Sequence, residues 1–286
     1  GPTEHVAVEA FDAAGNSVVH AFDITVLTPN NAPELAAAAP VLGQTDEDNA
    51  MVVALADFIN AGTGSTIITD ADASDPLGGI AVVAPTGRGV WEYSLDGVVF
   101  EVIESVSYAS ALLLPPGAQL RYTPDRANGE SASITYAAWD QTTGAAGGRI
   151  DATARGGNGA LSQLVDMGWL AVTDLNDAPV LAPVAPLLGA TTGQSAVTIT
   201  LDQFINQGLG TTTITDVDSG AVVGGLALVA TTGEGTWQYS LDGVIFDEVG
   251  TLSDEFALLL PLGATLRFTP SSGAAGATAT VSYRAW

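Results

Sequence analysis

The stretch GVWEYSLDGVVF at residues 89–100 returns as GTWQYSLDGVIF at residues 235–246, an offset of 146 residues. In both copies Trp, Tyr and Leu alternate with polar residues, and an Asp-Gly pair follows at once. Alternation with a period of two is typical of a strand with one buried face, and Asp-Gly is the strongest short signal for a hairpin turn. The sequence therefore predicts the same β-hairpin twice, with one core-facing set of side chains in each copy: Trp91, Tyr93 and Leu95, then Trp237, Tyr239 and Leu241.

Further stretches repeat on the same spacing. TDAD at residues 69–72 returns as TDVD at 215–218, and NNAPEL at 30–35 returns as NDAPVL at 176–181. ALLLPPGAQLRYTP also returns, as ALLLPLGATLRFTP, whereas ITYAAW at 134–139 returns one residue late as VSYRAW at 281–286. A fixed period over this length indicates a repeated structural module.

The Asn/Asp-Ala-Pro signals near residues 31 and 177 mark the expected module boundaries. Proline cannot donate to a sheet ladder, and it holds the residue before it in an extended conformation. We therefore expect three segments. Residues 1–30 supply closing strands of a preceding module, residues 31–176 form a full module, and residues 177–286 form a second module that lacks its last strand.

Local patterns predict strands almost throughout the chain. Alternating runs such as HVAVEAF and AFDITV are separated by frequent Gly and Pro, and helix signals are few. LADFIN at 55–60 and LDQFIN at 201–206 are each expected to form one helical turn, and LSQLVDMG at 161–168 two turns at most. Many short strands without interleaved helices favour an all-β fold of tandem antiparallel β-sandwiches.

The charge is strongly one-sided, with seven Arg, no Lys and 32 Asp or Glu, for a net charge of −25. Nucleic acids and anionic membrane surfaces are bound through clustered cations, so neither is an expected partner. No run of about 18 apolar residues is present that would predict insertion into a bilayer. High ionic strength or bound multivalent cations would relieve the self-repulsion, and both conditions are typical of an extracellular, cell-surface setting.

The sequence offers little to catalysis. It contains no cysteine, and its two histidines, His5 and His20, precede the first module, so neither module holds a Ser-His-Asp triad. A pair of carboxylates would suit a glycosidase. However, Glu92 in the first copy is replaced by Gln238 in the second. We therefore expect a protein that is not an enzyme.

Around TDLNDAPVL at residues 173–181 the chain resembles the cadherin-like, immunoglobulin-like tandem repeats of giant bacterial surface proteins, including RTX-type adhesins. Such repeats carry an Asp-x-Asn-Asp linker, an Asp-x-Asp pair in mid-module and an Ala-x-Asp-x-Gly-like stretch before the last strand. The matching residues are Asp174, Asn176 and Asp177 in the linker, Asp70 with Asp72 and Asp216 with Asp218 in mid-module, and Asp140 in AWDQTTG.

The resemblance implies Ca²⁺ at these acidic residues, because calcium takes about six to eight oxygen ligands from carboxylates, carbonyls and Asn side chains. If the linker around Asp174 and Asp177 meets the next Asp-x-Asp pair, four carboxylates converge there and require cations. The first linker departs from the pattern, since Thr28 and Asn31 replace the two Asp residues. The calcium hypothesis therefore applies chiefly to the second linker. A simpler alternative is that the Asp residues only end strands, through hydrogen bonds to their own backbone.

These features favour a calcium-rigidified spacer or adhesion module of a secreted surface or biofilm protein, whose partners are neighbouring repeats and possible homotypic or glycan contacts. One alternative is a carbohydrate-binding module that uses loops or the surroundings of Trp139 and Trp169. A second alternative is a strand-exchanging filament subunit. In that case the leading FDITV segment of one chain fills the place of the missing last strand in another.

Overall fold

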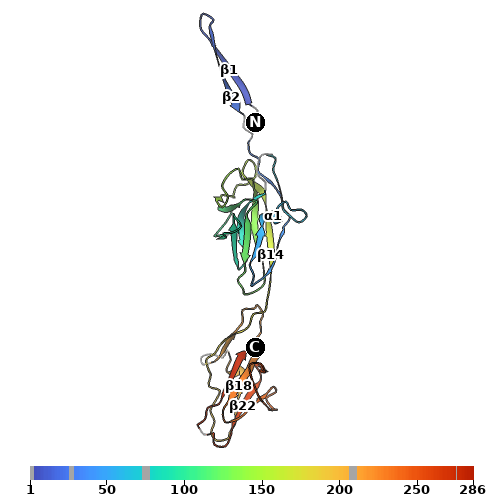
Figure 1. Cartoon of the computed structure of the whole chain (residues 1–286), viewed down its shortest axis with the longest axis vertical. Coiled ribbons are helices and arrows are strands. Elements are labelled where there is room, and N and C mark those ends of the chain that lie inside the picture. Colours follow the sequence, from blue (N-terminus) through green and yellow to red (C-terminus); the bar gives the residue numbers. More distant parts are fainter. Residues whose placement is uncertain (1–2, 26–28, 73–77, 206–210, 275) are drawn as a thin grey trace. The chain divides into compact units, whose positions relative to one another are not determined.

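The computed structural model describes residues 3–25, 29–72, 78–205, 211–274 and 276–286 (Figure 1). The chain divides into two compact units, Gly1–Asp174 and Leu175–Trp286. This division falls two residues before the boundary expected from the Asp-Ala-Pro signal. Strands dominate both units, which confirms the predicted all-β fold. Among the described residues, no helix has the length and apolar character that crossing a bilayer requires.

The described residues of the first unit form fourteen strands and one helical turn, α1 (Leu55–Phe58). Its strands are β1 (Thr3–Phe11), β2 (Ser17–Thr25), β3 (Glu34–Ala36), β4 (Val41–Asp46), β5 (Met51–Ala54), β6 (Ile67–Thr69), β7 (Gly79–Thr86), β8 (Val90–Ser94), β9 (Glu101–Val102), β10 (Ala111–Leu114), β11 (Gln119–Thr123), β12 (Glu130–Trp139), β13 (Arg149–Ile150) and β14 (Leu161–Thr173).

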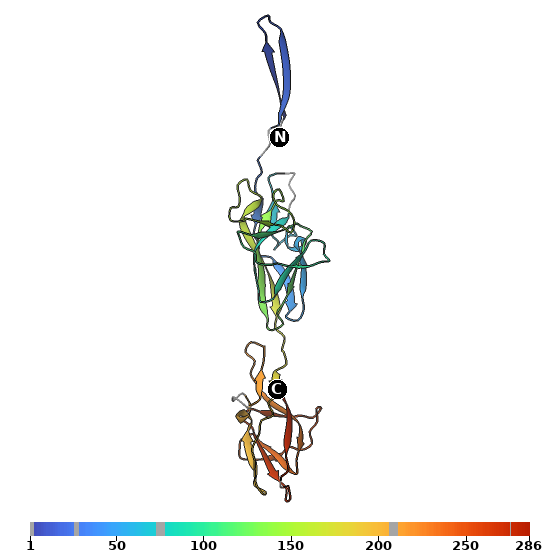
Figure 2. The same cartoon turned by 90° about the vertical axis from the view of Figure 1, so that its left-hand side faces the viewer.

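These strands build a β-sandwich (Figure 2). One sheet has the order β13-β10-β7-β12-β14-β4 and the other has the order β5-β11-β8-β9, while β3-β6 and β1-β2 form two-stranded sheets of their own. The main core lies between the two larger sheets and includes Ile134 and Tyr136 from one, and Trp91 and Tyr122 from the other. Burial of this apolar surface is the main source of stability in a chain without disulfides.

The six-stranded sheet is also covered on its outer face. Ala81, Leu113, Trp139 and Leu161 form a second, smaller cluster of buried side chains there. The central strands β7 and β10 are therefore buried on both faces, which explains why their sequences read as nearly continuous apolar runs.

The second unit repeats the arrangement with fewer strands. Its elements are β15 (Val180–Ala182), β16 (Val197–Thr200), the 3₁₀ turn η1 (Leu201–Gln203), β17 (Thr213–Thr215), β18 (Gly225–Thr232), β19 (Gly235–Ser240), β20 (Asp247–Glu248), β21 (Leu258–Pro261), β22 (Thr265–Pro270) and β23 (Thr280–Ala285). The sheet orders β16-β22-β19-β20, β21-β18-β23 and β15-β17 match β5-β11-β8-β9, β10-β7-β12 and β3-β6 of the first unit. The internal repeat read from the sequence is thus a structural repeat.

Three local predictions can be compared with these elements. The hairpins at the Asp-Gly pairs are confirmed as β8-β9 and β19-β20. The short turns at 55–60 and 201–206 are confirmed as α1 and η1, although Asn206 lies outside the described residues. The expected turns at 161–168 are wrong, because this segment begins β14 and pairs along β12. Tertiary pairing has overridden its weak helical pattern.

The predicted core face of the repeated hairpin holds for the aromatic residues but not for the leucines. Trp91 and Tyr93 are buried, whereas Leu95 and Leu241 are exposed. Strand β8 ends at Ser94, where the Asp-Gly turn begins, so Leu95 leaves the sheet before alternation can direct it inward.

Asp166 is a buried carboxylate in the middle of β14, with 6% of its surface exposed. It accepts hydrogen bonds from the amides of Ala38 and Ala39 (3.0 Å each), where the chain crosses from β3 to β4, and from the hydroxyls of Thr66 and Tyr136. Burial raises its pKa, but these hydrogen bonds and one from the Met167 amide more than offset that effect. The pKa of Asp166 therefore lies below its ordinary value.

We expect Asp166→Asn to lower the unfolding free energy of the first unit by about 1.5–3 kcal/mol, because hydrogen bonds to a buried charge are lost. The depressed pKa makes this contribution complete above the unfolded-state pKa of about 4 and lost as pH falls through the folded value. The difference between parent and variant should therefore shrink below about pH 4. Urea unfolding across pH measures it. Asp151→Asn, at an exposed Asp that also accepts local hydrogen bonds, is the control and should not move the midpoint.

Candidate metal sites at the Asp-x-Asp turns

The first Asp of each Asp-x-Asp pair closes a local turn. Asp70 follows the end of β6, and its Oδ1 accepts a hydrogen bond from the Asp72 amide at 2.9 Å. Asp216 follows the end of β17 and accepts the Asp218 amide in the same way, also at 2.9 Å. Asp70 and Asp216 therefore each end a strand through a hydrogen bond to nearby backbone, as Asp often does. The carboxylate of the second Asp in each pair bonds to a different segment.

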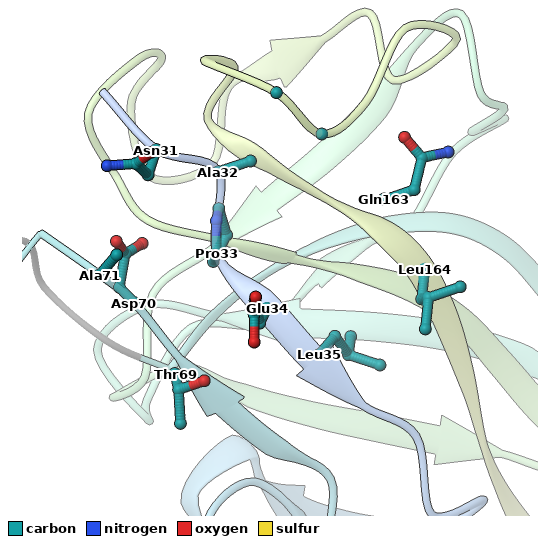
Figure 3. A pocket seen from close by; sticks show the side chains of 12 residues that line it. Asn31, Ala32, Pro33, Glu34, Leu35, Thr69, Asp70, Ala71, Gln163 and Leu164 are labelled. Atoms are coloured by element: carbon teal, nitrogen blue, oxygen red, sulfur yellow. The ribbon is translucent and has the colours of Figure 1, made fainter. Parts of the chain in front are cut away.

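The second Asp of each pair receives the linker. The Asn31 amide donates to Asp72 Oδ2 at 2.6 Å, and the Asp177 amide donates to Asp218 Oδ2 at 2.9 Å. Figure 3 shows Asn31, on the segment that leads into β3, beside Asp70 at the end of β6. Pairing of β3 with β6, and of β15 with β17, brings each linker to its turn.

The side chain at the linker position separates the two copies. In the first unit, Asn31 Nδ2 donates a second hydrogen bond to Asp72, on Oδ1 at 3.2 Å. In the second unit this residue is Asp177, whose side chain is a carboxylate and has no amide group to donate. Asp218 Oδ1 is buried and accepts no hydrogen bond from the described residues. A buried carboxylate oxygen costs free energy unless a donor or a cation compensates it.

Asp140 in the first unit is satisfied by protein donors. It is 1% exposed. Its Oδ1 accepts the amide and hydroxyl of Thr142 at 2.8 and 2.6 Å, and its Oδ2 accepts Asn30 Nδ2 at 3.0 Å. Asn30 Nδ2 also reaches the carbonyl of Gly159 at 3.0 Å. Asp72 and Asp140 thus both accept hydrogen bonds from amide nitrogens of the linker residues Asn30 and Asn31.

The remaining linker residues make other hydrogen bonds. Asp174 belongs to the first unit and accepts the Gly129 amide at 2.8 Å, whereas Asn176 Nδ2 donates to the Asp177 carbonyl at 2.8 Å. Thr28, expected to weaken the first linker, lies outside the described residues. Glu47 is buried, and its backbone amide donates a hydrogen bond to the carbonyl of Thr173, the residue before Asp174. Glu47 was not predicted as a site residue, because TDED at residues 45–48 has the pattern of an ordinary turn.

In the second unit, therefore, the structure brings together Asp177, Asp216 and Asp218. In the first unit it gathers Asp70 and Asp72 at Asn31, and it joins Asp140 to Asn30. Neither Asn30 nor Asn31 was expected to donate hydrogen bonds to these Asp residues. The one signal in the sequence is that Asn31 of the first copy corresponds to Asp177 of the second.

A groove of about 690 Å³ lies beside the turn of the first unit (Figure 3). Its lining includes Glu34, Asp70, Gln163 and Leu164. None of the described residues that line it is aromatic, and Trp139, one of the two residues considered for sugar stacking, is buried with its indole nitrogen bonded to the Thr143 carbonyl. This groove lacks the stacking platform that sugar rings favour.

No family model and no curated protein matches the chain. Among solved structures, an endo-fucoidan hydrolase from glycoside hydrolase family 107 is similar to 99% of this chain at 14% sequence identity, with a TM-score of 0.27. The chain spans 33% of that protein's length. A likeness this low indicates neither a shared fold nor a shared activity.

We expect Asn30→Ala to lower the unfolding free energy of the first unit by about 1–3 kcal/mol, because one oxygen of the buried Asp140 loses its donor. Asn176→Ala changes the equivalent residue of the second copy, whose amide only bonds to an exposed carbonyl, and should cost less than about 0.5 kcal/mol. Chemical unfolding followed by tryptophan fluorescence measures both. Equal losses in the two variants would contradict the role given to Asn30.

Proposed function

We propose that this chain is a spacer or adhesion module of a secreted surface protein, and that Ca²⁺ bound at the start of the second unit restrains the link between the two units. The observation that carries the proposal is the contrast between Asp72 and Asp218. Both accept the linker amide on Oδ2, but only Asp72 has an amide donor for Oδ1 among the described residues.

The chemistry of the second turn suits a hard cation. Asp177 and Asp218 place two carboxylates at the linker, and Asp216 stands at the head of the same turn. Calcium accepts carboxylate and carbonyl oxygens in flexible geometry, so it can take the free Asp218 Oδ1 together with further oxygens. Two carboxylates held side by side repel each other unless a positive charge lies between them. The net charge of −25 adds to this repulsion.

In this proposal, the bound ion stiffens the chain by restraining the linker between the two units. Strand β14 ends at Thr173 and β15 begins at Val180, so a short segment without regular structure joins the units. An ion on Asp177 and Asp218 ties this segment to the turn after β17 and reduces the backbone freedom of the link. A spacer gains stiffness in this way without a larger interface. The resemblance to cadherin-like repeats supports the same reading.

We expect the chain to bind Ca²⁺ in isothermal titration calorimetry, and Asp177→Asn to weaken binding at least tenfold, because the variant acquires the amide that Asn31 supplies in the first copy. Asn31→Asp is the reciprocal change and should create a second binding event. Asp57→Asn, on α1, is the control. Binding of equal strength in the parent and in Asp177→Asn would refute the assignment.

We also expect calcium to narrow the distribution of distances between the units. The chain has no cysteine, so spin labels can be placed at Val98→Cys and Val244→Cys, two exposed residues at the same loop of each copy. Double electron–electron resonance should give a broad distribution in chelator and a narrower one in calcium, and Asp177→Asn should remain broad in both. If calcium binds but leaves the parent's distribution unchanged, the site exists without the proposed stiffening.

A further inference from the structure

A pocket of about 300 Å³ lies in the second unit, beside the connection from β18 to β19 and the end of β20. Its lining includes Thr231 of β18, Thr236 and Trp237 of β19, and Glu248 of β20. The described residues that line it all fall between Thr231 and Gly250. This volume is at the lower end of the range for small-molecule sites, so a ligand that fits here is small.

The backbone around the pocket has the same frame in both copies. The indole nitrogen of Trp237 donates to the Thr232 carbonyl at 2.9 Å, as that of Trp91 donates to the Thr86 carbonyl at 2.8 Å. The Val249 amide also donates to the Trp237 carbonyl, at 3.1 Å. These hydrogen bonds come from the backbone and the indole groups. The frame therefore does not depend on the other side chains that line the pocket.

The side chains on this frame differ between the copies. On the repeat spacing of 146 residues, three polar residues of the pocket stand where the first copy has apolar ones. The pairs are Thr231 for Pro85, Thr236 for Val90 and Glu248 for Val102. At a fourth position Gly250 replaces Glu104, which removes a side chain. The second copy thus has hydrogen-bonding groups on this frame that the first copy lacks.

The polar groups of the pocket are not used within the protein. The hydroxyls of Thr231 and Thr236 and the carboxylate of Glu248 form no hydrogen bond or ion pair with any described residue. Glu248 is exposed, and the ring of Trp237 is partly buried. A single exposed polar side chain is ordinary. Three that line one pocket form a set of donors and acceptors for a ligand.

The chemistry of these groups fits a neutral sugar. A carboxylate accepts hydrogen bonds from two adjacent hydroxyls, a threonine hydroxyl both donates and accepts, and an indole ring offers an apolar surface to C–H groups. The negative charge of Glu248, in a chain of net charge −25, disfavours an anionic sugar. A bare calcium ion needs about six oxygen ligands, and Glu248 is the one carboxylate among the described lining residues.

We propose that this pocket binds a neutral sugar, with adjacent hydroxyls of the sugar donating to Glu248 and with its apolar C–H groups against Trp237. The hydroxyls of Thr231 and Thr236 bond to the remaining sugar hydroxyls. The site uses none of the Asp residues assigned to calcium. A sugar held here gives the module an adhesive contact in addition to its role as a spacer.

An NMR titration of the ¹⁵N-labelled full chain tests the proposal, in chelator so that the outcome is independent of calcium. The probes are methyl β-glucoside, methyl β-galactoside and methyl α-mannoside, each up to about 50 mM. At least one should shift the amide signals of Gly233, Gly235 and Gly250, with a Kd of about 1 mM for a ligand of this size. The uronic acid counterpart of that glycoside should bind at least tenfold more weakly, because Glu248 repels its carboxylate.

Two variants install side chains of the first copy. Glu248→Val should weaken binding at least tenfold, because hydrogen bonds to a charged group are lost, and Thr236→Val should weaken it several-fold. Glu255→Val is the control, at an exposed glutamate of the same unit outside the described lining, and should bind like the parent. The amide spectrum of each variant confirms that it is folded. The proposal is overturned if no probe shifts the pocket glycines, if Glu248→Val binds like the parent, or if Glu255→Val weakens binding equally.

Discussion

The pairing of β12 with β14 is the interaction on which the first unit depends. It places a strand of thirteen residues over the edge of the core, and it brings Asp166 to the point where the chain crosses from β3 to β4. A carboxylate at this depth is tolerable only because backbone amides and hydroxyls surround it. The closing strand therefore fixes the crossing segment as well as the core, and one side chain couples the two.

The two copies show how a fold can be kept while its electrostatics change. The linker amide binds the second Asp of the turn in both copies, so the backbone path is the same. The side chain at that position is free to differ, because the path does not depend on it. Asn31 brings a donor and completes the first turn with the protein's own atoms. Asp177 brings a further acceptor and leaves the second turn short of positive charge.

Much of the fold could be predicted from the sequence, because its signals are local. The repeated Trp-x-Tyr alternation and the Asp-Gly turns each act within a few residues, and both lie where they were expected. The segment at 161–168 was misread because its strand conformation comes from β12, which is distant in sequence. The prediction that Leu95 faces the core was wrong, because β8 ends one residue earlier, at Ser94, and the alternation of faces stops there.

The candidate site was only partly predictable, for a different reason. The Asp residues could be read from short motifs, but the partners that satisfy them could not. Asn30 reaches Asp140 across 110 residues of chain, and only the folded sheet order makes them neighbours. Sequence shows where charge is concentrated, whereas the donors that neutralise it are known only once distant strands are paired.

Dissolved salt and the proposed calcium ion would act on different parts of this molecule. Dissolved ions screen charges that water reaches, and they weaken the repulsion that spreads over an acidic surface within about 10 Å at 0.1 M. They do little for an oxygen that is out of contact with water, such as Asp218 Oδ1. That oxygen needs a partner in direct contact. Stiffness at the linker, as proposed, should therefore follow the divalent cation and depend little on ionic strength.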